Sequence, residues 1–565
     1  MEDIKVHEVG AYPIVKYYME ELGVYELFEK EFSKDGKDGS LISSSLCILI
    51  MNIILSIKPL YKISEWLTGY SDGKSEFGYE ANQYNDDVLG RSLDSLYETN
   101  RSILLSSLSV QAIKKHDLCT DKAHNDTTTV TLSGAYTEIR GTETDNYAIP
   151  KQGYNKDGRP DAKQIVFGLN TLGDGHVPIY YKSYSGNTSD TETHQVNWLE
   201  LKNLLGRADF VYTGDSKLAT KENMAYLSEN KGQFISILPA SRSEVKEFKS
   251  KVKTGEIEPK WEEGLTKENS RKKGQEDVYE IHKEEKTEEG YLIYWVRSSA
   301  KMGQDANRRT EKLNQAEKYL EELKPKLNKY YLKTREQIQG EINKNLKGIS
   351  ELFNIQIIEK KDIIKKKIGK GRVGKNTQYQ DEEVISYAIT FERNENAIKA
   401  EKKIDGLFPL VTNIPSTEKS SKEILTIYKQ QPHLEKRFAT MKSILEVAPM
   451  FLKLPRRIEA MLFLYFIALM VITLMERRIR KSMEEQEIEK LPILPQQMNT
   501  EAPTWNNIRY FFNNVFVFVQ EDMNKVAHFL VKGFSKMHEK VLKLLNVPIH
   551  IFNISTVYWW RFESS

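Results

Sequence analysis

The stretch "HNDTTTVTLSGAY", residues 124–136, lies where the apolar spacing of the sequence changes from the period of a helix to the period of a strand. It is rich in β-branched residues, which favour extended backbone, and Gly134 stands where a strand would end. We therefore predict a strand here, with Asp126 inside it. His124 faces the same side of that strand, where it either lies near a site or has a structural role.

Strand-like and helix-like segments alternate after this strand. Short runs rich in Val, Ile, Phe and Tyr predict strands at residues 163–172, 177–186, 209–216 and 233–239, and amphipathic patterns predict helices at 191–206 and 221–232. The resulting order, β-β-β-α-β-α-β, predicts a mixed five-stranded sheet flanked by helices. The predicted fold class is therefore α/β.

Three acids stand out by their places in this order. Asp126 lies in the first strand and Asp215 follows the fourth, and we expect these two strands to be neighbours in the sheet. A helix packed on the sheet brings in a third carboxylate, Glu435. Clustered carboxylates raise each other's pKa, and a hard divalent cation removes that penalty. Mg²⁺ suits such a set, and two ions about 3.5–4 Å apart clamp both oxygens of an in-line phosphoryl displacement.

The segment "YKQQPHLEKRFATMKS", residues 428–443, surrounds the third acid with cations. Pro432 suits a first helical position with Gln431 as the cap, so Glu435 falls in the first helical turn. Lys442 lies seven residues further on the same face, where it can meet a phosphate. The tyrosine that opens the segment offers a hydroxyl to the same phosphate. Taken alone, the segment is also compatible with an ordinary surface helix.

The spacing Tyr428-x2-Gln431-x3-Glu435-x6-Lys442 resembles the Y-x2-R-x3-E-x6-K signature of a large group of bacterial insertion-sequence transposases. The stretches "DTTTV" and "TGDSK" around the two aspartates, and "DGLFPLVTN" ahead of the glutamate, are also similar to that group. The resemblance covers residues 120–480. Gln431 stands where the signature has arginine, which keeps hydrogen bonding but loses a charge and should weaken phosphate binding there.

This resemblance implies an RNase H-like catalytic domain in which Asp126, Asp215 and Glu435 hold two Mg²⁺ ions, with Mn²⁺ as a substitute. It also implies an insertion between the last strand and the glutamate. The expected parts are a helical N-terminal domain at 1–115, which binds DNA ends or supports the rest, the first catalytic part at 116–242, an α+β insertion at 243–405, the second catalytic part at 406–485, and a helical C-terminal region at 486–565.

The composition limits where DNA can bind. Hydrophobic residues make up 39% and charged residues 29% of the 565, which fits a soluble globular protein, and the formal net charge is only +2. A DNA surface must therefore come from local segregation of charge. The candidates are Arg242 and, in the segment "KKKIGKGRVGK", Lys366, Lys370 and Arg372. The alternative for that segment is a solvated loop.

Cysteine content and hydropathy bear on localisation. Two cysteines, Cys47 and Cys119, give neither a disulfide framework nor a zinc site, so we expect a reducing compartment, and no signal peptide is visible. We expect the protein in the cytoplasm with the bacterial nucleoid. The apolar run at 458–475 is close to the length of a membrane span, but it contains Glu459, so we interpret it as a core helix, with a span as the alternative.

The function predicted from these features is DNA transposition. The protein would cut the ends of its own insertion element, bind terminal inverted repeats and target DNA, and act as a homodimer without a membrane. Two alternatives stay open at this point: a structure-specific, metal-dependent nuclease, and an adopted DNA-binding protein without catalysis.

Overall fold

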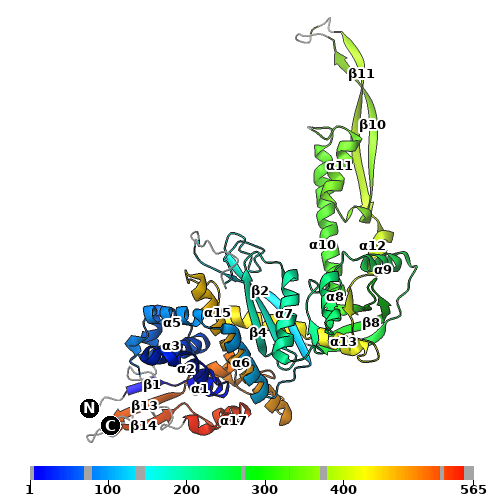
Figure 1. Cartoon of the computed structure of the whole chain (residues 1–565). Coiled ribbons are helices and arrows are strands. Elements are labelled where there is room, and N and C mark those ends of the chain that lie inside the picture. The colour runs from blue at the N-terminus through cyan, green and yellow to red at the C-terminus, as the bar shows by residue number, and fades with distance from the viewer. Residues whose placement is uncertain are drawn as a thin grey trace. The chain divides into compact units, whose positions relative to one another are not determined.

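The computed structural model describes residues 5–68, 79–134, 136, 147–268, 274–329, 331–368, 374, 378–521 and 527–552. The protein is mixed α/β with a large multi-strand sheet and many helices (Figure 1). The chain forms two compact units: unit 1 contains residues 1–236 and 426–565, and unit 2 contains residues 237–425. Unit 2 is wider than the insertion predicted at 243–405, because it also takes in β12 (Leu407–Thr412).

The central strand of unit 1 is β2 (Lys122–Thr131), which contains the quoted stretch up to Thr131. In spatial order the strands are β4 (Pro178–Ser185), β3 (Gln164–Leu172), β2, β5 (Val211–Thr213) and β6 (Gln233–Ile237), and each overlaps a strand predicted from the sequence. β3 pairs antiparallel with β2 and β4, whereas β5 runs parallel to β2 and β6. Every residue of β3 is buried, so side chains cover both faces of the sheet there.

Two helices follow the strands as predicted. α7 (Asp190–Leu205) packs against β2, β3 and β4, and α8 (Lys221–Glu229) packs beside α7. The side chains of Ser189 and Thr220 accept hydrogen bonds from the first turns of these helices. Gly206 ends α7 in the left-handed region with φ 67°, where a glycine is favoured.

The apolar run at 458–475 lies in α15 (Pro455–Glu485), which packs against β4, α3 (Gly36–Leu55) and α5 (Asp86–Glu98). Two helices of the described residues, α3 and α15, are long and apolar enough to cross a membrane by length and composition. The most apolar window of α15 is 94% buried in this structure, so the run forms a core helix here.

The N-terminal region is mostly helical, as predicted. Its elements are β1 (Lys5–Glu8), α1 (Tyr12–Glu21), α2 (Val24–Phe32), α3, α4 (Ile63–Thr68), α5 and α6 (Arg101–Lys115). The expectation of a helical segment at 486–565 is wrong in part. That region contains α16 (Trp505–Phe512) and α17 (Lys536–Leu544), but also β13 (Phe516–Glu521) and β14 (Ala527–Lys532).

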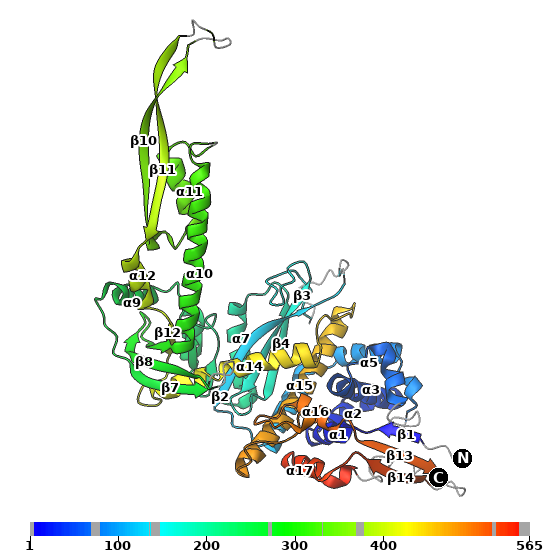
Figure 2. The same ribbon diagram turned by 180° about the vertical axis from the view of Figure 1, so that it is seen from behind.

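The C-terminal strands join the start of the chain in a small antiparallel sheet of the order β1-β13-β14, which Figure 2 shows beside α1 and α17. The segment "VFVFV", residues 515–519, consists only of β-branched and aromatic residues. These residue types favour strands, and here they override the helical pattern that precedes them.

Unit 2 contains four antiparallel strands in the order β12-β9-β8-β7, with β7 (Glu262–Glu268), β8 (Glu276–Lys286) and β9 (Leu292–Ser298). Its helices are α9 (Ser243–Thr254), α10 (Ser299–Leu323), α11 (Arg335–Asn345) and α12 (Glu395–Lys402). As predicted, the long charged helix breaks at Pro325, which lies in a 3₁₀ turn after α10. A long antiparallel ribbon of β10 (Phe353–Lys367) and β11 (Tyr379–Arg393) completes the unit.

Candidate active site

The two aspartates lie at the same level on neighbouring parallel strands. In the β2–β5 register His124 pairs with Thr213, and Asp126 and Asp215 each follow two residues later. Adjacent strands are about 4.8 Å apart. The backbone therefore places both carboxylates at the edge of the sheet where β5 ends, as the strand order predicts.

Glu435 reaches this edge on α14 (Gln431–Ala439), which packs against β2. The amide of Gln431 donates to the Asn125 carbonyl (2.8 Å), and its oxygen lies 3.1 Å from Nδ1 of His124. These contacts hold the first turn of α14 beside Asp126. Glu435 is one turn further along the helix and is exposed.

Tyr428, the last residue of α13 (Ser421–Tyr428), is near all three acids. Burial raises the pKa of its hydroxyl, and the negative charges of Asp215, Glu435 and Asp126 raise it further, in that order. The charges of all three carboxylates therefore act on the Tyr428 hydroxyl. Among the described residues, however, no group of three His, Cys, Asp or Glu side chains could hold a metal ion as they stand.

A lysine that the sequence analysis did not single out lies beside Asp126. Nζ of Lys156 is 4.0 Å from Oδ1 of Asp126 and donates to the carbonyl (2.7 Å) and hydroxyl (3.1 Å) of Thr127. Its charge also lowers the pKa of Asp215. Lys156 comes from the loop between β2 and β3, and no spacing in the sequence marks it.

The environment of Asp215 keeps its carboxylate ionised. Burial raises the pKa of this carboxyl, but contact with His194 (Nε2 to Oδ1, 3.7 Å) and the backbone N–H of Lys217 (2.9 Å) outweigh burial and leave that pKa below its usual value. An ionised oxygen ligand is what a hard divalent cation requires. The carboxylates of Asp126, Asp215 and Glu435 are therefore suitable oxygen ligands for a hard divalent cation, provided that the ammonium of Lys156 moves aside.

Lys442 is tied to the loop that carries Lys156. It lies in a π-helical turn, Thr440–Ile444, that continues α14, and its Nζ donates to Oδ1 of Asp157 (2.5 Å). Asp157 also accepts from the hydroxyl of Thr131 at the end of β2 (2.8 Å). Lys442, which the sequence analysis predicted to bind a phosphate, is thus paired with an acid in this structure.

Two histidines, His124 and His176, form a seat for α14, and a third, His433, belongs to the helix itself. The ring of His176 lies 5.6 Å from that of His124 and stacks on that of His433 at 4.6 Å. Burial lowers the pKa of His124 to about 4 and that of His176 to about 2, so both are neutral at pH 7. His124 is fully buried and holds Gln431, which favours its structural role.

Arg437 fixes the other end of α14. Its guanidinium donates to Glu476 of α15 (2.5 Å) and to the carbonyls of Gly175 (2.8 Å) and His176 (3.2 Å). Arg437 and Glu476 are both buried. Because the seat binds one face of α14, Glu435 is left on the open face.

The remaining predicted DNA ligands have varied positions. Gln431 is only 7% exposed and its side chain is bound to β2, so it is not available to a phosphate in this structure. It is also the first residue of α14 rather than its cap. Arg242 forms close pairs with Glu244 (2.6 Å) and Glu289 (2.7 Å), which occupy its guanidinium. Lys366 is exposed and pairs with Glu382 (2.6 Å). Lys370 and Arg372 lie outside the described residues.

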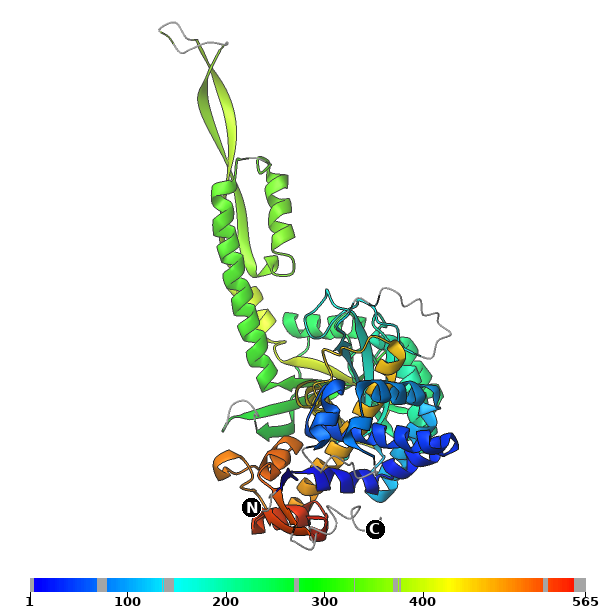
Figure 3. The same cartoon turned by 90° about the vertical axis from the view of Figure 1, so that its left-hand side faces the viewer.

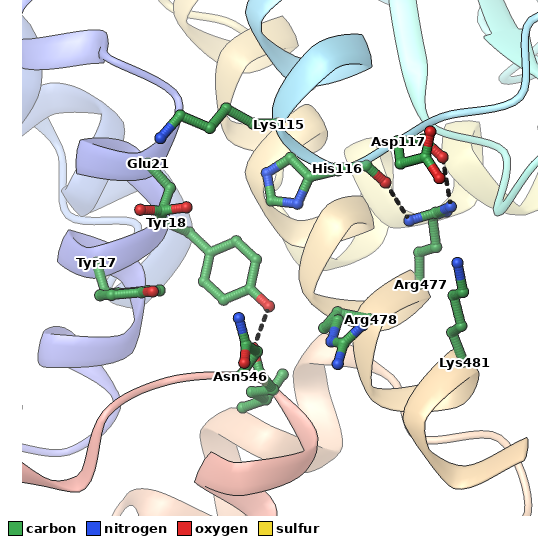
Figure 4. Close-up of a pocket in the computed structure, with 11 residues that line it drawn as sticks. Tyr17, Tyr18, Glu21, Lys115, His116, Asp117, Arg477, Arg478, Lys481 and Asn546 are labelled. Carbon is green, nitrogen blue, oxygen red and sulfur yellow. Dashed lines mark hydrogen bonds between the residues drawn. The ribbon is translucent and has the colours of Figure 1, made fainter. Parts of the chain in front are cut away.

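None of the three acids lines the cavities found among the described residues of unit 1. A polar cavity of about 230 Å³ is bordered by His116, Arg477, Arg478, Lys481 and the stacked Tyr18, and Figure 4 shows their side chains around it. A larger, mostly apolar cavity of about 650 Å³ includes Phe451 and Tyr61 in its lining. The candidate active site is instead the open edge of the sheet around Asp126 and Asp215.

Two family models match the sequence, one over its N-terminal part and one over the part that follows. Residues 136–471 match the family model "Transposase DDE domain", and residues 4–110 match "Domain of unknown function (DUF4277)". No curated protein matches the sequence.

Among solved structures, a cryo-EM structure of the piggyBac transposase synaptic complex with hairpin DNA matches over 50% of this chain and 60% of its own, with 11% identity and a TM-score of 0.28. The Mos1 transposase paired-end complex with left transposon end matches over 32% of this chain and 58% of its own, with 11% identity and a TM-score of 0.15. The match thus spans about 60% of the length of each relative. TM-scores this low carry no argument beyond the match to the transposase family model. The transposase model alone covers more than half of the chain, and the protein therefore belongs to the DDE-domain transposase family.

Proposed function

We propose that this protein is the transposase of its own insertion element and that it cuts and joins the element's ends. Asp126, Asp215 and Glu435 are the proposed metal ligands, on a sheet of RNase H-like order. The observation that carries the proposal is the β2–β5 register, which sets Asp126 and Asp215 side by side, with Glu435 brought to them by the anchored helix α14.

The proposed cofactor is a pair of Mg²⁺ ions, which Mn²⁺ can replace. Held by Asp126, Asp215 and Glu435, such ions would supply Lewis-acid activation of a water, and of a freed 3′-hydroxyl, for attack on a phosphodiester. The chain's own residues prepare that site. Contact with His194 and the N–H of Lys217 keep Asp215 ionised, and Gln431 holds the first turn of α14 beside Asp126. Lys156 balances the charge of Asp126 until a cation takes its place.

DNA contacts follow from the cations around this edge. Lys442 exchanges Asp157 for a phosphate, which is favourable because phosphate oxygens accept charge-assisted hydrogen bonds at least as well as a carboxylate. The sequence of the ribbon tip, with Lys370 and Arg372, suits a DNA backbone. We further propose that two copies act together in the bacterial cytoplasm, since two element ends must be joined.

An Asp215→Asn variant tests the catalytic assignment. It should bind the terminal repeats normally and lose Mg²⁺-dependent cleavage, because an amide is a poor ligand for a hard cation. Asp209→Asn is the matched control: Asp209 is an exposed acid just before β5 that pairs with Arg207. Cleavage that survives in Asp215→Asn would contradict the proposal.

A joining assay separates transposition from simple hydrolysis. Pre-cut ends with a free 3′-hydroxyl are incubated with target DNA and Mg²⁺. We expect covalent joining by the wild-type protein and none by Asp215→Asn. Cleavage of intact ends without joining of pre-cut ends would instead identify a nuclease, and binding without either reaction an adopted DNA-binding protein.

A further inference from the structure

The connection between β2 and β3 turns back along β2 before it enters β3. Its described residues 147–163 form no helix or strand, and Figures 1 and 3 draw the connection as an irregular loop. Near its base, Lys151 and Gln164 exchange two backbone hydrogen bonds (3.0 and 3.2 Å), which fix the loop to the start of β3. We call residues 154–161 the strap. No residue of the strap is buried, so it can leave β2 without exposing a core.

Threonines on one face of β2 hold the strap. Thr127, Thr129 and Thr131 alternate along the strand, so their side chains point to the same face. The hydroxyl of Thr129 accepts from the N–H of Lys156 (3.0 Å), and the ammonium of Lys156 donates to the carbonyl of Thr127 (2.7 Å). The hydroxyl of Thr131 donates to the carboxylate of Asp157 (2.8 Å). Polar contacts of this kind, rather than burial of apolar groups, fix the strap along β2.

The two charged residues in the middle of the strap lie at two positions that the proposed reaction needs. Nζ of Lys156 is 4.0 Å from Oδ1 of Asp126, a proposed metal ligand. The next residue, Asp157, accepts from Nζ of Lys442 (2.5 Å), the predicted phosphate ligand. An ammonium therefore stands beside the carboxylate that a metal ion would use, and a carboxylate stands on the lysine that a phosphate would use. Each has the same sign of charge as the ligand that it replaces.

These two contacts cannot be broken independently. Lys156 and Asp157 are consecutive residues, whose Cα atoms are about 3.8 Å apart. A cation that expels Lys156 from Asp126 also draws Asp157 away from Lys442. A phosphate that takes Lys442 from Asp157 in turn loosens the hold of Lys156 on Asp126. Coupling between two binding sites is reciprocal, so each ligand should raise the affinity for the other by the same factor.

We propose that residues 154–161 are an autoinhibitory strap, which a divalent cation and a DNA phosphate displace as one segment, so that the two ligands bind cooperatively. The inference rests on the proposed function and adds a regulatory step to it: the metal site opens fully only when DNA is at hand. Without DNA, the strap reduces the apparent affinity for metal in proportion to the fraction of molecules in which it is open.

A neutral substitution at the far end of the strap gives the first test. Thr131→Val removes the hydrogen bond to Asp157 at a position five residues along β2 from Asp126, and it changes no charge. We expect this variant to bind Mn²⁺ about threefold to tenfold more tightly than the wild type in calorimetry without DNA, as loss of one hydrogen bond to the strap implies. Thr128→Val is the matched control, because Thr128 points to the opposite face of β2.

An acidic residue of the strap gives a test in which the strap and simple electrostatics predict opposite signs. Asp157→Asn removes a negative charge near the metal site, which by itself would weaken the binding of a cation. Loss of the pair with Lys442 should instead release the strap and tighten Mn²⁺ binding by a similar factor. Asp161→Asn is the control: Asp161 belongs to the same strap and pairs with Arg159 (2.9 Å).

Hydrogen exchange reads the position of the strap without any catalytic turnover. The N–H of Lys156 donates to Thr129, and the N–H of Asp157 donates to the side chain of Asn155 (2.7 Å). A bound ligand usually slows exchange near its site, but here Mn²⁺ should speed exchange at both of these amides. Duplex DNA added without metal should do the same. In Thr131→Val the two amides should exchange faster than in the wild type before any ligand is added.

The outcomes separate failure of the strap from failure of the catalytic site. Unchanged Mn²⁺ affinity in Thr131→Val together with lower affinity in Asp157→Asn would overturn the strap, while loss of Mn²⁺ binding in Asp215→Asn would still support the metal site. Strap amides that exchange no faster with bound Mn²⁺ would show that the ion enters without displacing Lys156, which also overturns the inference. If neither the wild type nor Thr131→Val binds Mn²⁺ without DNA, the strap does not control the metal site, whether or not the protein cleaves DNA.

Discussion

At the scale of single residues, Lys156 supplies the positive charge beside Asp126 when no metal ion is bound. Asp126 and Asp215 are brought together by the strand register, and their mutual repulsion needs a counter-charge. The ammonium of Lys156 supplies it at 4.0 Å from Asp126. If Asp126 is the metal ligand proposed above, a metal ion must compete with this ammonium for the same carboxylate, so we expect Lys156 to limit the affinity for metal.

Lys156→Met should therefore bind divalent cations more tightly. A unit charge about 4 Å from a partly exposed carboxylate is worth about 1 to 2 kcal/mol, which corresponds to roughly 5- to 30-fold in the dissociation constant. Mn²⁺ binding followed by calorimetry or electron spin resonance measures the change. Lys151→Met, an exposed lysine earlier in the same connection, is the control. Unchanged or weaker Mn²⁺ binding by Lys156→Met would show that the lysine does not compete.

Gln431 has a structural role that its place in the signature does not suggest. Gln431→Ala would leave Nδ1 of His124 and the carbonyl of Asn125 without their buried partner. Unsatisfied buried polar groups cost about 1–3 kcal/mol. We expect a lower melting temperature together with reduced cleavage, because α14 loses its contact beside Asp126. Lys436→Ala, on the exposed side of the same helix, should change neither quantity. Normal stability with reduced DNA affinity would instead support the original phosphate-binding prediction.

At the scale of elements, α14 depends on neutral histidines. The pKa of His124 is about 4 and that of His176 is about 2 in the folded protein, below the ordinary value of about 6.5, because burial disfavours their charged forms. Between the folded and the ordinary values, the unfolded chain binds more protons than the folded one. Stability is therefore greatest above about pH 6.5 and falls as the pH is lowered through this window.

His176→Asn should reduce that sensitivity to acid. Asparagine tolerates the left-handed backbone at this position, where φ is 54°, and it does not titrate. Between pH 7 and pH 5 the unfolding free energy of the variant should fall by about 2 kcal/mol less than that of the wild type. Urea unfolding at the two pH values measures this, with His550→Asn, which is outside this group of histidines, as the control. Equal losses of unfolding free energy in the wild type and in His176→Asn would contradict the role of the buried histidines.

The elements also show what the sequence could and could not predict. The strands around Asp126 and Asp215 were predictable because β-branched runs and turns are local signals, and their order predicted that these two strands are neighbours, although their register is known only from the structure. The sheet of β1 with β13 was not, because Lys5 pairs with Val519 and no local pattern connects them. Lys156 was missed for a related reason: its position depends on a loop conformation. The burial of Gln431 was not predicted, because helical periodicity indicates on which face of a helix a residue lies and not what packs against that face.

At the scale of the whole molecule, all three acids belong to unit 1, although most of the chain between Asp215 and Glu435 belongs to unit 2. Unit 2 has its own buried cluster from α10, α11 and the ribbon base, and its own antiparallel strands. Such a unit can be gained or altered without changing the register of β2 and β5. A long insertion is therefore compatible with the proposed site, which needs exact placement of three carboxylates.

Unit 2 should fold without unit 1. Residues 237–425 expressed alone should fold and unfold cooperatively, because the segment contains a complete core. Circular dichroism during heating measures this. Leu320→Ala, at a fully buried position of α10, should lower the stability of the isolated segment by about 2–5 kcal/mol through the cavity that it leaves. Lys318→Ala, two residues earlier on the exposed side of α10, should change it little. A segment without a cooperative transition would show that unit 2 depends on unit 1 for folding, and the insertion would then be part of the catalytic unit rather than an independent addition.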